Sequence, residues 1–258
     1  MISVETILEA KQAEVERLRK ERPWEKRSRR RGRYSFRKAL ARDGLSIIAE
    51  IKRSSPSTGS FEVEPRPVLE AYEAAGVDAL SILSDRHFGM SPEEFEDLAA
   101  KTSLPVLRKD FLLAPEQIRE SVVLGADAVL VIVAFLEDAV LEALLDEARD
   151  AQLDVLVEIH SAEDLKRLPR NTEIVGINNR DLSSPSYETD ANRARELARD
   201  VPAGYLLVAE SGYESPEDLP QRADAVLIGG AFLRHVRRFG EVKSLVEKFR
   251  TSRAGDPR

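Results

Sequence analysis

The chain has 258 residues, of which 42% are hydrophobic and 33% charged, so its length and composition fit one barrel-sized domain with a substantial core. The formal net charge of −7 argues against general nucleic-acid binding, and the lack of cysteine excludes disulfides and thiolate chemistry. Its apolar runs are too short to span a membrane, and residues 1–10 lack the pattern of a signal peptide. We therefore expect a cytoplasmic protein without nucleic-acid or membrane partners.

Residues 1–45 differ from the rest of the chain and predict a helical extension packed on the main domain. Apolar side chains recur at helical spacing from Val4 to Leu18, and Ser35–Ala41 indicates a second short helix. Between them lies a basic stretch, Lys26–Arg33, which could bind a polyanion or lie on a solvated face. We favour the solvated face because the stretch is short and the whole chain is acidic.

Beyond the extension, short apolar runs alternate with longer charged segments of helical pattern. The runs begin about 20 to 33 residues apart, which is the length of a strand–helix unit. Eight runs are present: Ser46–Ile51, Ala79–Leu83, Pro105–Leu107, Ala128–Val133, Asp154–Val157, Ile174–Ile177, Tyr205–Val208 and Ala225–Ile228. Eight units predict an α/β protein with a closed (β/α)8 barrel over residues 46–250, followed by a disordered tail at 251–258. No Gly-x-Gly-x-x-Gly follows the first run, which disfavours a dinucleotide-binding sheet.

Capping residues support helices between the predicted strands. Gly76 and Gly125 are typical helix C-terminal stops. Helix starts are indicated by serines at Ser91, Ser161 and Ser215, two of them followed by proline.

Polar residues follow most of the apolar runs directly. The carboxyl ends of barrel strands meet at one mouth, where the active sites of such barrels lie. We expect the following side chains to converge there: Glu50, Lys52, Asp85, Lys109, Glu158, Asn178 and Glu210. A structural ion-pair network is the alternative. We favour a catalytic site, because lysines and carboxylates that shift each other's pKa are typical of general acids and bases.

The last two strand ends predict a phosphate site. Gly212 after the seventh strand and the pair Gly229-Gly230 after the eighth let backbone amides approach an anion closely. A short helix beginning after Gly230 would point its N-terminus at the same place, and Ser55 in the long first loop could add a hydroxyl.

Phe88, Phe111 and Phe135 offer an apolar surface for an aromatic or aliphatic part of the substrate, with ordinary packing as the alternative for each one. The histidines show no metal-ligand spacing, and we interpret His160 as a solvated or hydrogen-bonded residue rather than a ligand. We expect no metal and no cofactor.

Taken together, these segments resemble the indole-3-glycerol phosphate synthase family. The resemblance covers nearly the whole chain, and its motifs are specific in combination. The matching segments are Ile48–Ser57, Leu107–Phe111, Val157–His160, Gly176–Leu182 and Ala209–Gly212.

The resemblance implies a ring closure without a cofactor, followed by loss of carbon dioxide and water from 1-(2-carboxyphenylamino)-1-deoxyribulose 5-phosphate. Lys109 would be the general acid that protonates the ribulose carbonyl oxygen. Lys52 would hold the anthranilate carboxylate and donate a later proton, and Glu158 would be the general base that removes the ring proton. We expect the crowded mouth to lower the pKa of a catalytic lysine such as Lys109.

The same resemblance implies roles for the remaining site residues. The lysines and substrate hydroxyls would be oriented by Glu50, Asn178 and Glu210. The phosphate would be held by Ser55, Ser211, Gly212, Gly229 and Gly230. The anthranilate side would be lined by Phe88, Phe111 and Leu182, and Arg180 completes the binding set.

The chain departs from the family pattern at Met90 and at Gly230, where the family more often has Ser or Glu after the first glycine. A hydroxyl contact to the phosphate would then be missing, which leaves a backbone contact at this position.

Two alternative functions remain open. A phosphoribosyl isomerase would carry paired Asp, or Cys with Asp, on the first and fifth strands, whereas here the first ends in Glu50-x-Lys52 and the third in Lys109. A non-catalytic phosphate-binding barrel would keep the glycines and lose the Lys109 and Glu158 pair, which is present. We expect a monomer or a weak homodimer acting on a small phosphorylated molecule.

Overall fold

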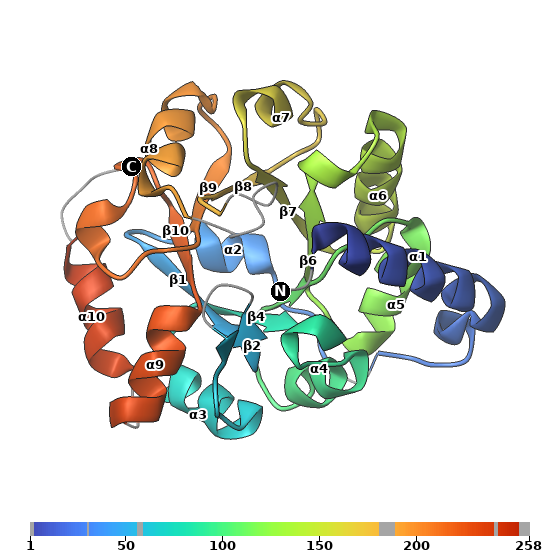
Figure 1. Cartoon of the computed structure of the whole chain (residues 1–258), viewed down its shortest axis with the longest axis horizontal. Coiled ribbons are helices and arrows are strands. Elements are labelled where there is room, and N and C mark those ends of the chain that lie inside the picture. The colour runs from blue at the N-terminus through green and yellow to red at the C-terminus, as the bar shows by residue number, and fades with distance from the viewer. Residues whose placement is uncertain (1–2, 30, 56–58, 181–188, 240–241, 253–258) are drawn as a thin grey trace.

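The structure is a computed structural model that describes residues 3–29, 31–55, 59–180, 189–239 and 242–252 (Figure 1). Within these ranges, eight parallel strands close a barrel in the order β1-β10-β9-β8-β7-β6-β5-β4, and β4 pairs back with β1. The strands are β1 (Ser46–Ile51), β4 (Ala79–Leu83), β5 (Val106–Lys109), β6 (Ala128–Ile132), β7 (Asp154–Ile159), β8 (Ile174–Asn178), β9 (Leu206–Glu210) and β10 (Ala225–Ile228). The predicted (β/α)8 barrel is confirmed.

Helices follow the strands around the barrel, as expected for this fold (Figure 1). They are α3 (Pro65–Ala75), α4 (Pro92–Ala99), α5 (Pro115–Leu124), α6 (Asp138–Asp150), α7 (Ala162–Lys166), α8 (Ala191–Asp200), α9 (Gly230–Phe239) and α10 (Lys243–Thr251). Short 3-10 helices are η1 (Pro23–Glu25), η2 (Arg86–Phe88), η3 (Val133–Phe135) and η4 (Pro216–Asp218), and β2 (Ser54–Ser55) pairs with β3 (Gly59–Ser60) in a small hairpin. No helix in the described ranges is long and apolar enough to cross a membrane.

The predicted helix caps are present with one exception. Ser91 and Ser161 accept hydrogen bonds from backbone amides of the first turn, and Gly76 and Gly125 end their helices in the left-handed conformation. The start predicted at Ser215 gives only the single 3-10 turn η4, with no side-chain cap bond. The reason is the proline at position 220, which pushes the preceding residue out of the helical region and ends the turn.

Several strands extend beyond the apolar runs that predicted them. β5 includes Lys109, β7 includes Glu158, and β8 and β9 include Asn178 and Glu210. Lys109 lies in register with Leu83, and Asn178 with Glu210. The polar side chains at the mouth are therefore held on the hydrogen-bonded barrel wall.

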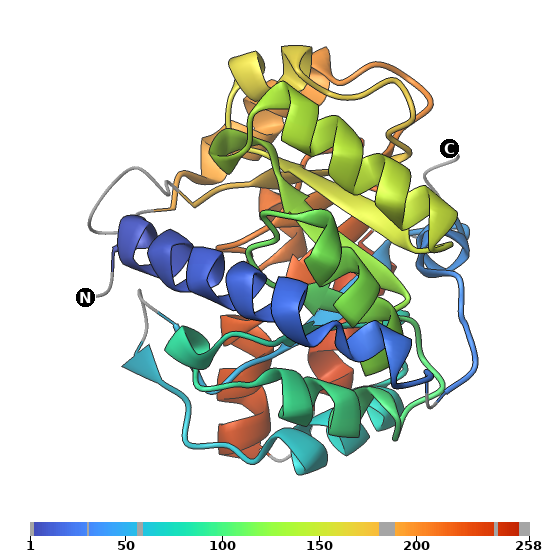
Figure 2. The same ribbon diagram turned by 90° about the vertical axis from the view of Figure 1, so that its right-hand side faces the viewer.

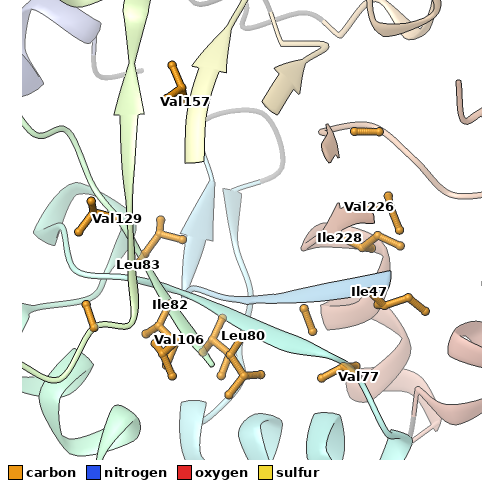
Figure 3. Packing of buried hydrophobic residues seen from close by; sticks show 14 of the residues in the cluster. Ile47, Val77, Leu80, Ile82, Leu83, Val106, Val129, Val157, Val226 and Ile228 are labelled. Atoms are coloured by element: carbon orange, nitrogen blue, oxygen red, sulfur yellow. The ribbon is translucent and has the colours of Figure 1, made fainter. Parts of the chain in front are cut away.

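The two faces of the strands bury two separate apolar layers. The outer layer packs against the surrounding helices, and Figure 3 shows part of it on neighbouring strands, including Ile47, Leu80 and Val226. The inner layer fills the barrel itself with residues such as Ile48 and Leu107. Because side chains alternate along a strand, the residues after this inner layer point into the mouth.

The N-terminal extension forms two helices, as predicted. α1 (Val4–Glu21) runs along the outside of the barrel and contacts α5, as Figure 2 shows with α1 in dark blue. α2 (Phe36–Leu40) places Phe36 and Leu40, both fully buried, into the inner layer. α2 therefore closes the barrel at the end opposite the mouth.

Two arginines of the basic stretch have neither of the roles considered from the sequence. Arg29 and Arg31 both form ion pairs with the buried carboxylate of Asp127, and their own side chains are nearly buried. Asp127 also accepts hydrogen bonds from the backbone amides of Tyr34 and Val106. These arginines anchor the extension to the start of β6, so the preference for a solvated face was wrong for them.

Lys11 of α1 makes the least expected contacts of the extension, because this charged side chain is buried on the apolar face of the helix. Its ammonium group lies 2.7 Å from Asp110, 2.9 Å from Asp85 and 3.1 Å from Glu14. Burial alone would lower the pKa of Lys11, but the carboxylates outweigh it and raise the pKa. Lys11 thus joins the outer helix to the loops that follow β4 and β5.

Replacing Lys11 with methionine should strongly destabilise the fold, because it removes the buried cation that Asp85 and Asp110 share and leaves Asp110 with Arg108 as its remaining cation. We expect the free energy of unfolding to fall by about 3–5 kcal/mol, as for other broken buried ion pairs. Urea unfolding of Lys11→Met at neutral pH measures this loss. Lys20→Met, on an exposed part of the same helix, should change stability by less than about 0.5 kcal/mol. Equal losses in the two variants would contradict the structural role of Lys11.

Candidate active site

A cavity of about 640 Å³ opens at the carboxyl ends of the strands, where the sequence placed the site. Of the predicted site residues, all but Ser55, Leu182 and Phe135 line it. The lining set includes Glu50, Lys52, Phe88, Lys109, Phe111, Glu158, Asn178, Arg180, Glu210, Ser211, Gly212, Gly229 and Gly230. Leu182 lies outside the described residues, and for Ser55, in β2, only the backbone belongs to the described part.

Lys109 lies at the centre of the charged side chains in this cavity. Its ammonium nitrogen is 3.1 Å from an oxygen of Glu158 and 3.7 Å from an oxygen of Glu210. Burial by itself would lower the pKa of Lys109, but the carboxylates of Glu158, Glu210 and Glu50 outweigh it and raise the pKa. The expectation of a lowered pKa was therefore wrong for this lysine, because three carboxylates face it.

Glu158 is fully buried and is held on both sides. One carboxylate oxygen contacts Lys109, and the other lies 2.8 Å from Nε2 of His160. Although burial opposes its negative charge, Lys109 and His160 lower the pKa of Glu158 well below its usual range, and a hydrogen bond with Asn178 adds to the effect. Of the two interpretations of His160, solvated or hydrogen-bonded, the second is confirmed, although its partner was not predicted. The spacing Glu158-x-His160 places both side chains on one face of a strand.

Glu210 lies beside this pair and has the opposite electrostatic balance. It is 1% exposed, and burial together with the negative charge of Glu158 raises its pKa well above the usual range. The space for its carboxyl group comes from Gly176 on β8. A Cβ atom at Gly176 would collide with a carboxylate oxygen of Glu210 and lie 3.1 Å from Leu156.

Glu50 and Lys52 form a second ion pair at the end of β1. Burial lowers the pKa of Lys52, and the nearby charges of Arg180 and Lys109 lower it further, against the opposing effect of Glu50. Burial would raise the pKa of Glu50, but Lys52 and Lys109 outweigh it and lower the pKa. The two lysines of the mouth therefore have pKa values shifted in opposite directions.

Position 229 requires a glycine for a steric reason, apart from the phosphate contact suggested by its place in the sequence. A Cβ atom there would collide with Glu50 and would lie 3.2 Å from the ammonium nitrogen of Lys52. The glycine therefore makes room for the ion pair of β1 across the barrel wall, consistent with the pairing of β1 and β10.

The glycine-rich end of the cavity is built from two neighbouring loops. Ser211 and Gly212 follow β9 with positive φ angles of 67° and 81°, and Gly230 begins α9. A positive φ is uncommon for serine, which indicates that the surrounding structure imposes this turn. Arg234, missed in the sequence, also lines the cavity: one guanidinium nitrogen is 3.2 Å from where a Cβ of Gly230 would lie.

The opposite end of the cavity is apolar. Phe88 in η2 and Phe111 after β5 line it, together with Leu130 and Ile132 of β6, which the sequence analysis did not single out. Phe135 packs against Phe111 with ring centroids 5.8 Å apart, so its part is to support that ring. The cavity therefore has an apolar end and a glycine-rich end, with the lysines and carboxylates between them.

Across the described residues, no three His, Asp or Glu side chains are grouped so as to hold a metal ion. The arrangement offers proton chemistry within a single cavity. It combines two lysines with Glu50 and Glu158, which are favoured in their charged forms, and Glu210, which is favoured in its neutral form.

Comparisons with known proteins agree with this geometry. A family model described as indole-3-glycerol phosphate synthase matches residues 4–245. The indole-3-glycerol phosphate synthase of Thermoanaerobacter pseudethanolicus is 36% identical over 95% of this chain and 97% of its own length. The enzymes of that name from Caldanaerobacter subterraneus and Saccharopolyspora erythraea are 38% and 43% identical, covering 96% and 74% of this chain and 98% and 73% of their own lengths.

A solved structure from Aquifex aeolicus aligns with a TM-score of 0.58 over 81% of this chain and 93% of that chain. At 15% identity it supports the fold alone. The family model spans each strand end that builds the cavity, and two of these relatives cover at least 95% of the chain. The chain belongs to the indole-3-glycerol phosphate synthase family.

Proposed function

We propose that this cavity closes the ring of 1-(2-carboxyphenylamino)-1-deoxyribulose 5-phosphate to give indole-3-glycerol phosphate, with loss of carbon dioxide and water. The chain is in this view a carboxy-lyase of tryptophan biosynthesis, like the relatives that carry the family name. The observation that carries the proposal is the contact of Lys109 with Glu158, which lies between an apolar end and a glycine-rich end of one cavity.

The two ends of the cavity match the two ends of the substrate. The anthranilate ring would pack on Phe88 and Phe111, which supply apolar ring surfaces. The phosphate would lie against the backbone of Gly212 and Gly230, where α9 begins and its N-terminus favours an anion. This orientation places the reacting carbons between the two ends, beside Lys109.

Lys109 would act as the general acid on the ribulose carbonyl oxygen. Its raised pKa keeps the ammonium group charged at neutral pH, so the group is ready to stabilise the alkoxide as it forms. An alkoxide is basic enough to take a proton even from an ammonium group of raised pKa. Carbon–carbon bond formation therefore leaves a neutral amine at this position.

Glu158 would act as the general base, and the charge on Lys109 controls its strength. While Lys109 is charged, the pKa of Glu158 stays low and the carboxylate is a weak base. Once Lys109 has given its proton to the alkoxide, Glu158 loses the positive charge that lay 3.1 Å away and its pKa must rise. The base thus becomes effective only after ring closure has begun.

Lys52 would hold the anthranilate carboxylate and later donate a proton to the leaving hydroxyl. Its lowered pKa makes it the better proton donor of the two lysines, and Glu50 keeps it in position through their ion pair. Asn178 and Glu210 would steady the acid and the base, since Asn178 hydrogen-bonds Glu158 and Glu210 contacts Lys109.

Replacing Lys109 with alanine should lower kcat by about 10²–10⁴-fold, because it removes the general acid. Indole product fluorescence with purified protein measures the rate, and circular dichroism checks that the variant is folded. Lys101→Ala, which removes an exposed lysine paired with Asp97, should keep the wild-type rate. A folded Lys109→Ala variant of near wild-type rate would refute the general-acid role.

The pH dependence should report Lys52. Because its pKa is lowered, Lys52 loses its positive charge at a lower pH than an ordinary lysine, and its hold on the substrate carboxylate weakens there. We expect the alkaline limb of kcat/KM to lie below about pH 10.4, the value of an unperturbed lysine. In Lys52→Arg the guanidinium stays charged, so this limb should move to higher pH even if the overall rate falls. An alkaline limb at the same pH in both proteins would assign it to another group.

Replacing Gly176 with alanine should displace Glu210 from Lys109, since the new Cβ and the carboxylate cannot occupy the same space. We expect a fall in kcat of about 10–100-fold, the scale of effect that a misplaced catalytic group can have. Gly32→Ala is the matched control, because a Cβ at Gly32 meets nothing within 4 Å. Steady-state kinetics and thermal unfolding of both variants measure the effect. Wild-type kcat in a folded Gly176→Ala variant would show that the position of Glu210 is unimportant.

A further inference from the structure

The ring of His160 lies against Glu158, one of the charged residues at the centre of the cavity. It follows β7, and its side chain is 10% exposed. Nε2 lies 2.8 Å from one carboxylate oxygen of Glu158, and Nδ1 lies 3.0 Å from the backbone carbonyl oxygen of Arg180. The ring therefore links the end of β7 to the loop after β8.

The position of this ring is fixed by its surroundings. The backbone amide of His160 donates to the carboxylate of Asp164, which also receives the amide of Ser161 in the cap of α7. On the other side, the Arg180 carbonyl oxygen also accepts a hydrogen bond from the guanidinium of Arg193. The backbone of His160 and the carbonyl group that its ring faces are thus both held independently of the ring itself.

The two neighbours of the ring are both hydrogen-bond acceptors. A neutral imidazole has one N–H and could satisfy only one of them, whereas the imidazolium form donates to both. In either form the ring can donate to the carboxylate of Glu158, which is an ionised acceptor. A charge-assisted hydrogen bond of this kind is roughly twice as strong as a neutral one.

We propose that His160 is a positioning residue that clamps the carboxylate of Glu158 and holds it ready to act as the base. The two oxygens of Glu158 have separate partners, His160 on one and Lys109 on the other. When Lys109 gives up its proton to the substrate, the oxygen facing it becomes free to accept a proton. The oxygen facing His160 stays bound, so the carboxylate does not rotate away at the step in which it is needed.

This inference rests on the proposed role of Glu158 as the base. The two can be tested separately, because turnover by the wild-type protein is measured first and does not involve any change at His160. Absence of wild-type turnover would remove the proposed function itself, whereas normal wild-type turnover leaves the inference about His160 to be decided by the variants.

The test compares His160→Phe and His160→Gln by steady-state kinetics across pH, with thermal unfolding of each. Phenylalanine keeps a ring but donates no hydrogen bond, and glutamine donates one without a positive charge. We expect kcat to fall by about 10–100-fold in His160→Phe and by less in His160→Gln, with KM changed by less than about threefold. His235→Gln, which changes a histidine outside the cavity, should keep the wild-type kinetics.

The pH profile separates positioning from a merely structural contribution. Because His160 lowers the pKa of Glu158, its removal should raise that pKa, so the acid limb of kcat/KM should move to higher pH in both variants. The other groups facing Glu158 and His160 are unchanged by the substitutions: Lys109, Glu210, Asn178, Asp164, Arg180 and Arg193. A kcat within twofold of wild type in both variants would overturn the proposal. A lower kcat with an acid limb at the wild-type pH would also overturn it. If His160→Phe does not fold, the pH profile of His160→Gln decides the question.

Discussion

Burial of the Lys109–Glu158 ion pair is the constraint on which the rest of the mouth depends. Two charges removed from water require partners for every remaining donor and acceptor, or the cost of desolvation exceeds their attraction. The neighbours of the pair meet part of this need: His160 takes the second oxygen of Glu158, and a carboxyl oxygen of Glu210 lies 3.7 Å from the ammonium nitrogen of Lys109. Gly176 in turn gives Glu210 its space. Each residue in this series is explained by the one before it.

Much of the fold could be predicted from the sequence because its signals are local. The spacing of apolar runs and the caps at Ser91 and Gly125 each depend on a few adjacent residues, and the barrel followed from repeating them. The convergence of Lys109 and Glu158 followed in turn from the barrel, since carboxyl ends of parallel strands meet at one mouth. The single-turn η4 shows the limit of such reasoning, because a proline further on overrode a good helix start.

The contacts that could not be predicted join residues far apart in the chain. The spacing of Lys11 places it on the buried face of α1, but does not show which residue it pairs with. Its partner Asp110 lies in the loop after β5. The pairing of Arg31 with Asp127 is of the same kind. The direction of the Lys109 pKa also depends on how many carboxylates face it in three dimensions, which no spacing along the chain reveals. Ion pairs between the N-terminal extension and the barrel are therefore contacts that the pattern of strands and helices does not predict.

The closure of the barrel by α2 has a consequence for how substrate enters the cavity and how products leave it. Phe36 and Leu40 fill the end opposite the cavity, so among the described residues the route left open is the mouth itself. Substrate, carbon dioxide, water and the indole product all share this one passage. The bulky product then blocks entry until it departs, which makes it a competitor of the substrate by geometry alone. In such a blind-ended chamber, the rate of emptying sets an upper limit on the rate of turnover.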